Sequence, residues 1–180
     1  MEEDAEKKGE RYFQAGKVLW AVKSGDVLHG KVLGTYPYYV RVNLLTGENL
    51  CTCPLGGDCK HVHAVLKAYQ SGMYFDGGSS LAPVNPEALA WEFLREVPEL
   101  AVEVALKELF NSLGRDESGS ETAMLFLRTL ELVRKSGRVE FLHPLEEALE
   151  EFSRVFEDYP LIKKLEREFE SLKLNPKKAL

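Results

Sequence analysis

Three cysteines and one histidine within a single short segment constrain this chain more than any other feature. The segment runs Cys51-Thr-Cys-Pro-Leu-Gly-Gly-Asp-Cys-Lys-His61 and has the spacing C-x-C-x5-C-x-H. It holds all three cysteines of the 180-residue chain. An odd number of cysteines argues against a disulfide framework, and a Cys51–Cys53 bridge would close a very small, strained ring. The cluster therefore predicts a local metal site.

Three thiolates and one imidazole make a complete tetrahedral donor set for zinc, which soft sulfur ligands favour over magnesium or calcium. Residues i and i+2 of a strand project to the same face, so Cys51 and Cys53 can point at one ion. Cys59 and His61 would enter around the start of a helix, whose free N–H groups support an anionic site. Because four protein ligands leave no open position, we expect one structural zinc per chain, on which folding of this segment depends. His63 is then a spare histidine that we expect to pack or to face solvent.

Hydrophobic periodicity divides the chain into a β-rich front and a helical back. Period-2 alternation and turn residues predict an antiparallel meander, followed by a helix around the second half of the metal segment. From Pro86 onward apolar residues recur at helical spacing, which predicts an all-α bundle. The expected fold class is thus α+β: a small β-meander plus helix that holds zinc, then a helical bundle. The expected strands are 17–23, 27–33 and 36–44, and the expected helices begin near residues 58, 86, 98, 121, 144 and 161.

These patterns predict two domains and the segments that flank them. We expect a zinc-binding domain over residues 9–72, a linker over 73–85 and the helical bundle over 86–176, with 1–8 as a charged tail. Charge follows the same division. Residues 7–75 carry nine Lys/Arg against four Asp/Glu, whereas 76–180 carry 14 against 21. Only the front domain has a positive net charge, which would attract a polyanion such as nucleic acid.

The metal segment and its surroundings resemble a SWIM-type zinc finger, a family defined by C-x-C-x(n)-C-x-H in a strand-strand-helix setting. Gly9-Glu-Arg-Tyr12 and Gly16-Lys-Val18 resemble the family's lead-in, and Cys59-Lys-His-Val-His-Ala64 resembles its helical signature. His63 departs from the pattern, which more often has an apolar or small residue there. The resemblance covers roughly residues 9–71 and implies DNA binding or protein–protein contact. A short SWIM protein with a helical tail looks most like the partners of RecA-family recombinase paralogues.

The function we expect is that of a non-enzymatic adaptor in DNA repair or homologous recombination. The chain has no phosphate-binding loop, dinucleotide fingerprint or nucleophile elbow. We therefore expect a protein partner, with a RecA-family recombinase paralogue as the candidate, and no small-molecule substrate. The alternative is a regulator that binds DNA or RNA directly; its candidate contacts are Lys31, Arg41, Lys60 and Lys67. The acidic N-terminus and the absence of a long apolar run predict a cytoplasmic protein with no membrane span.

Overall fold

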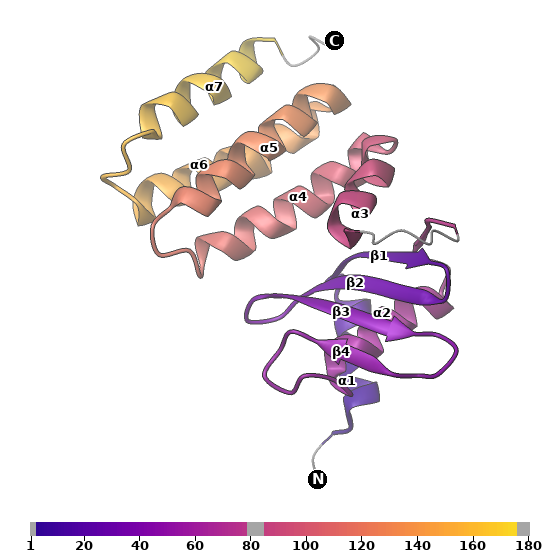
Figure 1. The fold of residues 1–180 in the computed structure, drawn as a ribbon. Helices are drawn as coiled ribbons and strands as arrows, with labels where there is room; N and C mark the ends of the chain where they lie inside the picture. The colour runs from indigo at the N-terminus through magenta and orange to yellow at the C-terminus, as the bar shows by residue number, and fades with distance from the viewer. Residues whose placement is uncertain (1–2, 79–84, 176–180) are drawn as a thin grey trace. The chain divides into compact units, whose positions relative to one another are not determined.

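The chain forms two compact units, Met1–Phe93 and Leu94–Leu180. A computed structural model describes residues 3–78 and 85–175, and Figure 1 shows the order of its elements. Among the described residues, no helix combines the length and the apolar character that crossing a membrane requires. Each unit buries apolar side chains of its own.

The first unit is built on a five-stranded sheet with the order β4-β3-β2-β1-β5. The predicted antiparallel meander is confirmed for its three expected strands, and a further short strand, β4, pairs antiparallel with β3. The short fifth strand pairs with β1 in parallel, so the sheet is mixed. The strands are β1 (Val18–Ser24), β2 (Val27–Leu33), β3 (Pro37–Asn43), β4 (Asn49–Cys51) and β5 (Phe75–Asp76).

Helix α2 (Lys60–Gln70) covers one face of this sheet. The alternation expected in the third strand is present, since Val40 and Val42 are buried and join Val62 and Val65 of α2 in one core. Gly30 lies directly beneath that helix, because a Cβ atom there would come within 2.5 Å of Val65 Cγ2. This core lies next to the metal segment, and two of its members are Cys51 and Cys59.

Helix α1 (Ala5–Gln14) packs against α2. It includes residues that we expected to form a frayed tail over 1–8; residues 1–2 of that tail lie outside the described part. The helix begins at Ala5 because Asp4 caps it, its Oδ1 accepting a hydrogen bond from Lys7 N at 2.8 Å. Gly9 allows the close helix contact, since a Cβ atom there would lie 2.4 Å from His63 Cβ.

The expected linker over 73–85 contains β5, and its residues 79–84 lie outside the described residues. Helix α3 (Pro86–Arg95), which we expected to open the bundle, falls mostly within the first unit. Phe93 of α3 stacks on Phe75 of β5 with ring centroids 5.1 Å apart. Hydrophobic periodicity predicts the helix itself, but it does not predict a contact such as this one between residues of different elements.

As far as residue 175, the second unit has α-helices at the four predicted places: α4 (Pro98–Leu113), α5 (Ser120–Ser136), α6 (Leu142–Val155) and α7 (Ile162–Leu174). A 3₁₀ turn over Val139–Phe141 precedes α6, which begins two residues before Pro144. The helices bury their apolar stripes against one another, with Phe126 and Phe152 among the largest fully buried side chains. Residue 176, the last of the expected bundle, lies outside the described residues.

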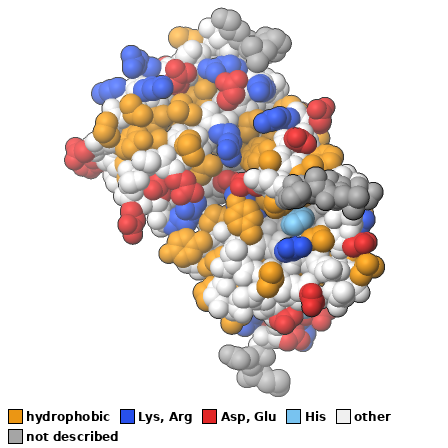
Figure 2. Space-filling model, viewed as in Figure 1, with side chains coloured by type: hydrophobic (Ala, Val, Ile, Leu, Met, Phe, Trp, Pro, Cys, Tyr) orange, Lys and Arg blue, Asp and Glu red, His pale blue; other side chains and the backbone are white. Residues whose placement is uncertain are grey.

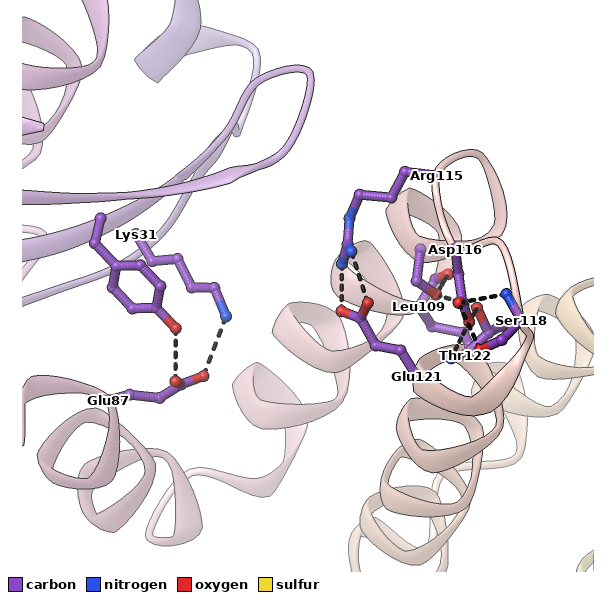
Figure 3. A network of polar contacts seen from close by, with 10 residues as sticks. Lys31, Glu87, Leu109, Arg115, Asp116, Ser118, Glu121 and Thr122 are labelled. Atoms are coloured by element: carbon purple, nitrogen blue, oxygen red, sulfur yellow. Dashed lines mark hydrogen bonds and ion pairs between the residues drawn. The ribbon is translucent and has the colours of Figure 1, made fainter. Parts of the chain in front are cut away.

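A polar network closes the turn between α4 and α5 (Figure 3). Asp116 Oδ2 accepts hydrogen bonds from Thr122 N and Thr122 Oγ1, both at 2.9 Å, and Thr122 Oγ1 also lies 3.0 Å from Ser112 Oγ. Beside them the Arg115 guanidinium forms a bidentate ion pair with the Glu121 carboxylate. The network satisfies backbone N–H groups at the start of α5, where Gly119 supplies no capping side chain.

Candidate metal centre

The four residues singled out by the sequence converge on one point of the first unit. The Sγ atoms of Cys51, Cys53 and Cys59 and a ring nitrogen of His61 lie within 4.8 Å of one another, and all four residues are buried. His61 Nδ1 is 3.7 Å from Cys51 Sγ and 3.6 Å from Cys59 Sγ. Zinc–sulfur and zinc–nitrogen bonds of normal length set donor atoms about 3.6 Å apart in a tetrahedron. The cluster therefore has the size and donor chemistry of a Cys3His zinc-binding site.

Two structural elements bring the donors together. Cys51 is the last residue of β4, and Cys53 follows it by two residues. Cys59 is the N-cap of α2, with extended backbone dihedrals and no capping hydrogen bond from its side chain. His61 stands in the first turn of that helix. The Cys59 sulfur is thus free for a metal and lies at the positive end of the helix dipole.

The loop between the two pairs of ligands is held by Asn49 and Asp58. Asn49 Oδ1 accepts from Asp58 N at 2.7 Å, while Asn49 Nδ2 donates to Asp58 Oδ1 at 2.9 Å. Asp58 has φ +46°, a left-handed conformation that aspartate tolerates better than most residues. The Cys51 N–H donates to Gly56 O, so the same loop also pairs with β4. Sequence reasoning missed this clamp, whose only signal is an Asn and an Asp flanking the cysteines.

Aromatic side chains fix the imidazole of His61. Its ring centroid lies 4.7 Å from that of Tyr38 and 5.6 Å from that of Tyr12. Gly34 leaves room for the ring, because a Cβ atom there would come within 2.9 Å of His61 Nε2. Since Nδ1 faces the sulfurs, Nε2 points away from them; it is buried and has no hydrogen-bond partner among the described residues. The packing of two tyrosines, and not a hydrogen bond, thus sets the orientation of this ligand.

The protonation of the ligands matches a site that requires a cation. Burial raises the pKa of the Cys51 thiol to about 12, so its thiolate needs positive charge nearby. Burial also opposes ionisation of Cys53, but hydrogen bonds from Cys51 and from backbone N–H groups of the loop outweigh it and lower the pKa of that thiol. Burial, aided by Lys60 and Lys17, lowers the pKa of His61 to about 4, which keeps the imidazole neutral and able to bind metal. Bound zinc supplies the charge that the thiolates need and crosslinks β4 to α2.

His63, two residues beyond the last ligand, lies outside the donor cluster. Its Cβ atom packs against Gly9 where α1 crosses α2. Of the two expected positions for this histidine, packing or facing solvent, the contact with Gly9 shows packing of its Cβ atom.

The four candidate nucleic-acid contacts lie on opposite sides of the sheet. Lys31 and Arg41 stand on the face away from α2, while Lys60 and Lys67 belong to α2 itself. The Lys31 side chain is only 7% exposed and pairs with Glu87 at 3.1 Å (Figure 3). Arg41 is exposed and lines a hollow of about 830 Å³ beside Tyr39 and Glu87. The structure therefore does not assemble the four into one surface.

Comparison with known proteins agrees with the donor geometry. Residues 40–70 match the SWIM zinc finger family. This stretch contains all four ligands together with β3, β4 and α2. The chain accordingly carries a SWIM zinc finger with a Cys3His site.

A longer similarity extends beyond the finger. The uncharacterized protein MJ1493 of Methanocaldococcus jannaschii is 30% identical over 140 residues, which is 77% of this chain. Because that length exceeds the first unit, the similarity reaches into the helical unit. The chain spans about half of that protein, covering 53% of its length. No solved structure matches the chain significantly.

Proposed function

We propose that this chain, a SWIM zinc-finger protein, is a non-enzymatic adaptor that holds macromolecular partners on the surfaces of its two units. The observation that carries the proposal is the closed donor set: three buried thiolates and one buried imidazole fill a tetrahedron. A zinc ion held by four protein ligands has no position for a substrate or an activated water, so it acts in folding and not in catalysis. The remaining function of such a domain is to present a surface.

The helical unit exposes large apolar side chains that are suited to a protein partner. Phe110 of α4 is 41% exposed and Met124 of α5 is 65% exposed. The contact between Ser112 and Thr122 fixes the register of these two helices. Phe110 and Met124 each lie two residues from that contact, which is about 200° of helix rotation, so Phe110 points away from α5 and Met124 points away from α4. Aromatic and methionine side chains are enriched at protein interfaces.

Charged side chains surround the apolar ones on the helical unit. In the view of Figure 2, acidic and basic side chains are interspersed over this unit, with apolar side chains reaching the surface between them. A polar, charged rim around an apolar centre is the usual composition of a transient protein interface. This arrangement supports a reversible partner rather than a permanent one.

The process that we propose is DNA repair or homologous recombination, in the cytoplasm, with a RecA-family recombinase paralogue as the partner. This part of the proposal depends on the resemblance to SWIM proteins that are partners of such ATPases. The geometry of the finger supports a structural role for zinc, and the exposed side chains of α4 and α5 support contact with a protein partner. A direct role in nucleic-acid binding is the second candidate, favoured by Lys17 and Lys60, which lie over one tyrosine ring and form no ion pair within the described ranges.

The test is a binding titration of the zinc-loaded full chain against each purified RecA-family ATPase of its source organism. We expect saturable binding to one of them and at least a tenfold loss for Phe110→Asp combined with Met124→Asp. Leu174→Asp, at a side chain that is 78% exposed on α7, is the matched control and should bind as the parent does. Absence of binding to every RecA-family ATPase would reject this partner, and an equal loss in the control would reject Phe110 and Met124 as the contact residues.

A further inference from the structure

The lysines of the first unit fall into two groups according to their acidic partners. Lys67 pairs with Glu10 at 3.5 Å, and Lys31 pairs with Glu87 at 3.1 Å. No ion pair with any residue of the ranges 3–78 and 85–175 is formed by the other lysines of this unit, which are Lys7, Lys8, Lys17, Lys23 and Lys60. A lysine without a carboxylate partner keeps its charge available for an anion from outside the chain.

Two of the lysines without acidic partners, Lys17 and Lys60, are close together although they come from different elements. Lys17 precedes β1, whereas Lys60 is the first residue of α2. Their Nζ atoms lie 4.4 and 4.8 Å from the centre of the same ring, that of Tyr12 in α1. A cation is attracted to the face of an aromatic ring, so Tyr12 holds both ammonium groups near one another without neutralising them.

The charge of the metal centre does not cancel this pair. Three thiolates, a neutral imidazole and a divalent zinc ion sum to a formal charge of about −1. Two ammonium groups lie beside that centre, so the surroundings of Tyr12 keep a positive excess. We call these two lysines and Tyr12, together with the exposed ring of Tyr36 described next, the Tyr12 patch.

An exposed aromatic ring continues the patch. The Tyr12 ring meets the His61 ring, His61 meets Tyr38, and Tyr38 meets Tyr36 edge-on at 6.4 Å between centroids. Tyr36 is 53% exposed. The patch thus combines positive charge that suits a phosphate backbone with a ring on which a base can stack.

We propose that the Tyr12 patch binds single-stranded nucleic acid, with Lys17 and Lys60 at the phosphates and Tyr36 stacked on an unpaired base. A duplex keeps its bases stacked inside the helix, so only a single strand uses both parts of the patch. The patch belongs wholly to the zinc-finger unit, and this binding is independent of any protein partner held by α4 and α5.

The experiment is a fluorescence anisotropy titration of the zinc-loaded full chain with labelled oligo-dT and oligo-U of about 20 nucleotides. The competing ligand is a DNA duplex of the same length. The salt concentration is varied between about 50 and 200 mM. The logarithm of the association constant falls with the logarithm of the salt concentration, and each lost phosphate contact makes this slope less steep by about 0.7 for a single strand. The two single strands show whether DNA or RNA is preferred.

The variants separate this site from general positive charge. We expect Lys17→Gln and Lys60→Gln each to weaken binding and to reduce the salt slope, and Tyr36→Ala to weaken binding about tenfold without changing the slope. Lys67→Gln is the matched control, because it removes the same charge from α2 but at a lysine already paired with Glu10. Zinc content and melting temperature verify that each variant is folded.

Three results would overturn the proposal. One is the absence of binding to either single strand at the lower salt concentration. Another is an equal effect of Lys67→Gln and Lys60→Gln, which would indicate diffuse electrostatics. The last is tighter binding to the duplex than to both single strands. None of these results depends on whether a RecA-family partner is found, so the two proposals fail separately.

Discussion

His61 Nδ1 lies 3.6 Å from the Sγ atom of Cys59, and a single lysine separates the two residues in the sequence. The contact is possible because Cys59 is the extended N-cap of α2 and His61 is already inside the helix. The change of backbone conformation between them turns both side chains toward the same point. This single helix start provides two of the four ligands, and β4 with its loop provides the others.

Removal of zinc should unfold the first unit and leave the second intact. Cys53→Ser or a strong chelator leaves buried thiols without the ion that crosslinks β4 to α2. Structural zinc contributes about 10 kcal/mol or more in small zinc fingers, which exceeds what a small unit retains by packing alone. Hydrogen-exchange mass spectrometry of the full chain measures both units at once. We expect loss of protection over β1–β4 and α2 and unchanged protection over α4–α7; a fully zinc-loaded Cys53→Ser protein of normal stability would contradict this.

His61 should bind zinc through Nδ1 and carry its proton on Nε2. The orientation follows from the distances of Nδ1 to two sulfurs and from the Tyr12 and Tyr38 rings that hold the imidazole. Nitrogen-15 NMR of the ring distinguishes the two forms. His63→Ala should retain one zinc per chain, since that residue lies outside the cluster. A metal-bound Nε2 would show that the ring is turned over.

Asn49→Ala should weaken zinc binding about 10- to 100-fold, the range seen when groups that support metal ligands are removed. The substitution deletes the two hydrogen bonds to Asp58 and a third to Gly47 O, so the loop that carries Cys53 loses its anchor. Competition with a chromophoric chelator measures the affinity. The exposed neighbour Glu48 gives the control, and Glu48→Ala should bind zinc as the parent does. Equal affinities for both variants would show that the clamp does not support the site.

Gly9→Ala should destabilise the first unit by about 1–3 kcal/mol, although alanine normally favours a helix by about 1 kcal/mol over glycine. The added Cβ atom would lie 2.4 Å from His63 Cβ and 2.8 Å from Lys60 O, so α1 must move away from α2. Thermal unfolding of the zinc-loaded protein measures the effect. Gln14→Ala, at an exposed position of the same helix, should leave the melting temperature almost unchanged. A stabilised Gly9→Ala variant would show that the two helices are not in this contact.

Asp116 should make the stability of the helical unit depend on pH. Burial opposes its ionisation, but hydrogen bonds from Thr122 and from backbone N–H groups of the turn outweigh it and lower its pKa in the folded state. Its contribution is therefore complete above the ordinary carboxyl pKa of about 4 and is lost as the pH falls toward the folded-state value.

Urea unfolding of Asp116→Asn tests this dependence. We expect a loss of about 1 kcal/mol at neutral pH, and a difference from the parent that shrinks on acidification below about pH 4. The exposed Asp158 has no hydrogen bond or ion pair within the described ranges, so Asp158→Asn serves as control. A difference that stays constant with pH would assign the effect to shape and not to charge.

The ligands, their donor chemistry and most of the helices and strands can be predicted from local sequence patterns. Cys51, Cys53, Cys59 and His61 were identified from spacing, because a metal needs donors of a given type at close range along the chain. Strands β1–β3 and helices α2 and α4–α7 follow from periodicities of 2 and 3.6, which record the face that each residue buries. These signals are local, so a single sequence carries them.

The way in which the elements meet depends on contacts that no local pattern predicts. Neither the packing of Tyr12 and Tyr38 on His61 nor the clamp between Asn49 and Asp58 has a periodicity that a sequence displays. The parallel strand β5 lies within the expected linker, and α1 extends into the expected tail. Lys60 and Lys67 look alike in sequence, yet one lies over an aromatic ring and the other pairs with Glu10. Which charges are neutralised depends on contacts between residues far apart in the chain, and those contacts exist only once the sheet and its helices have packed.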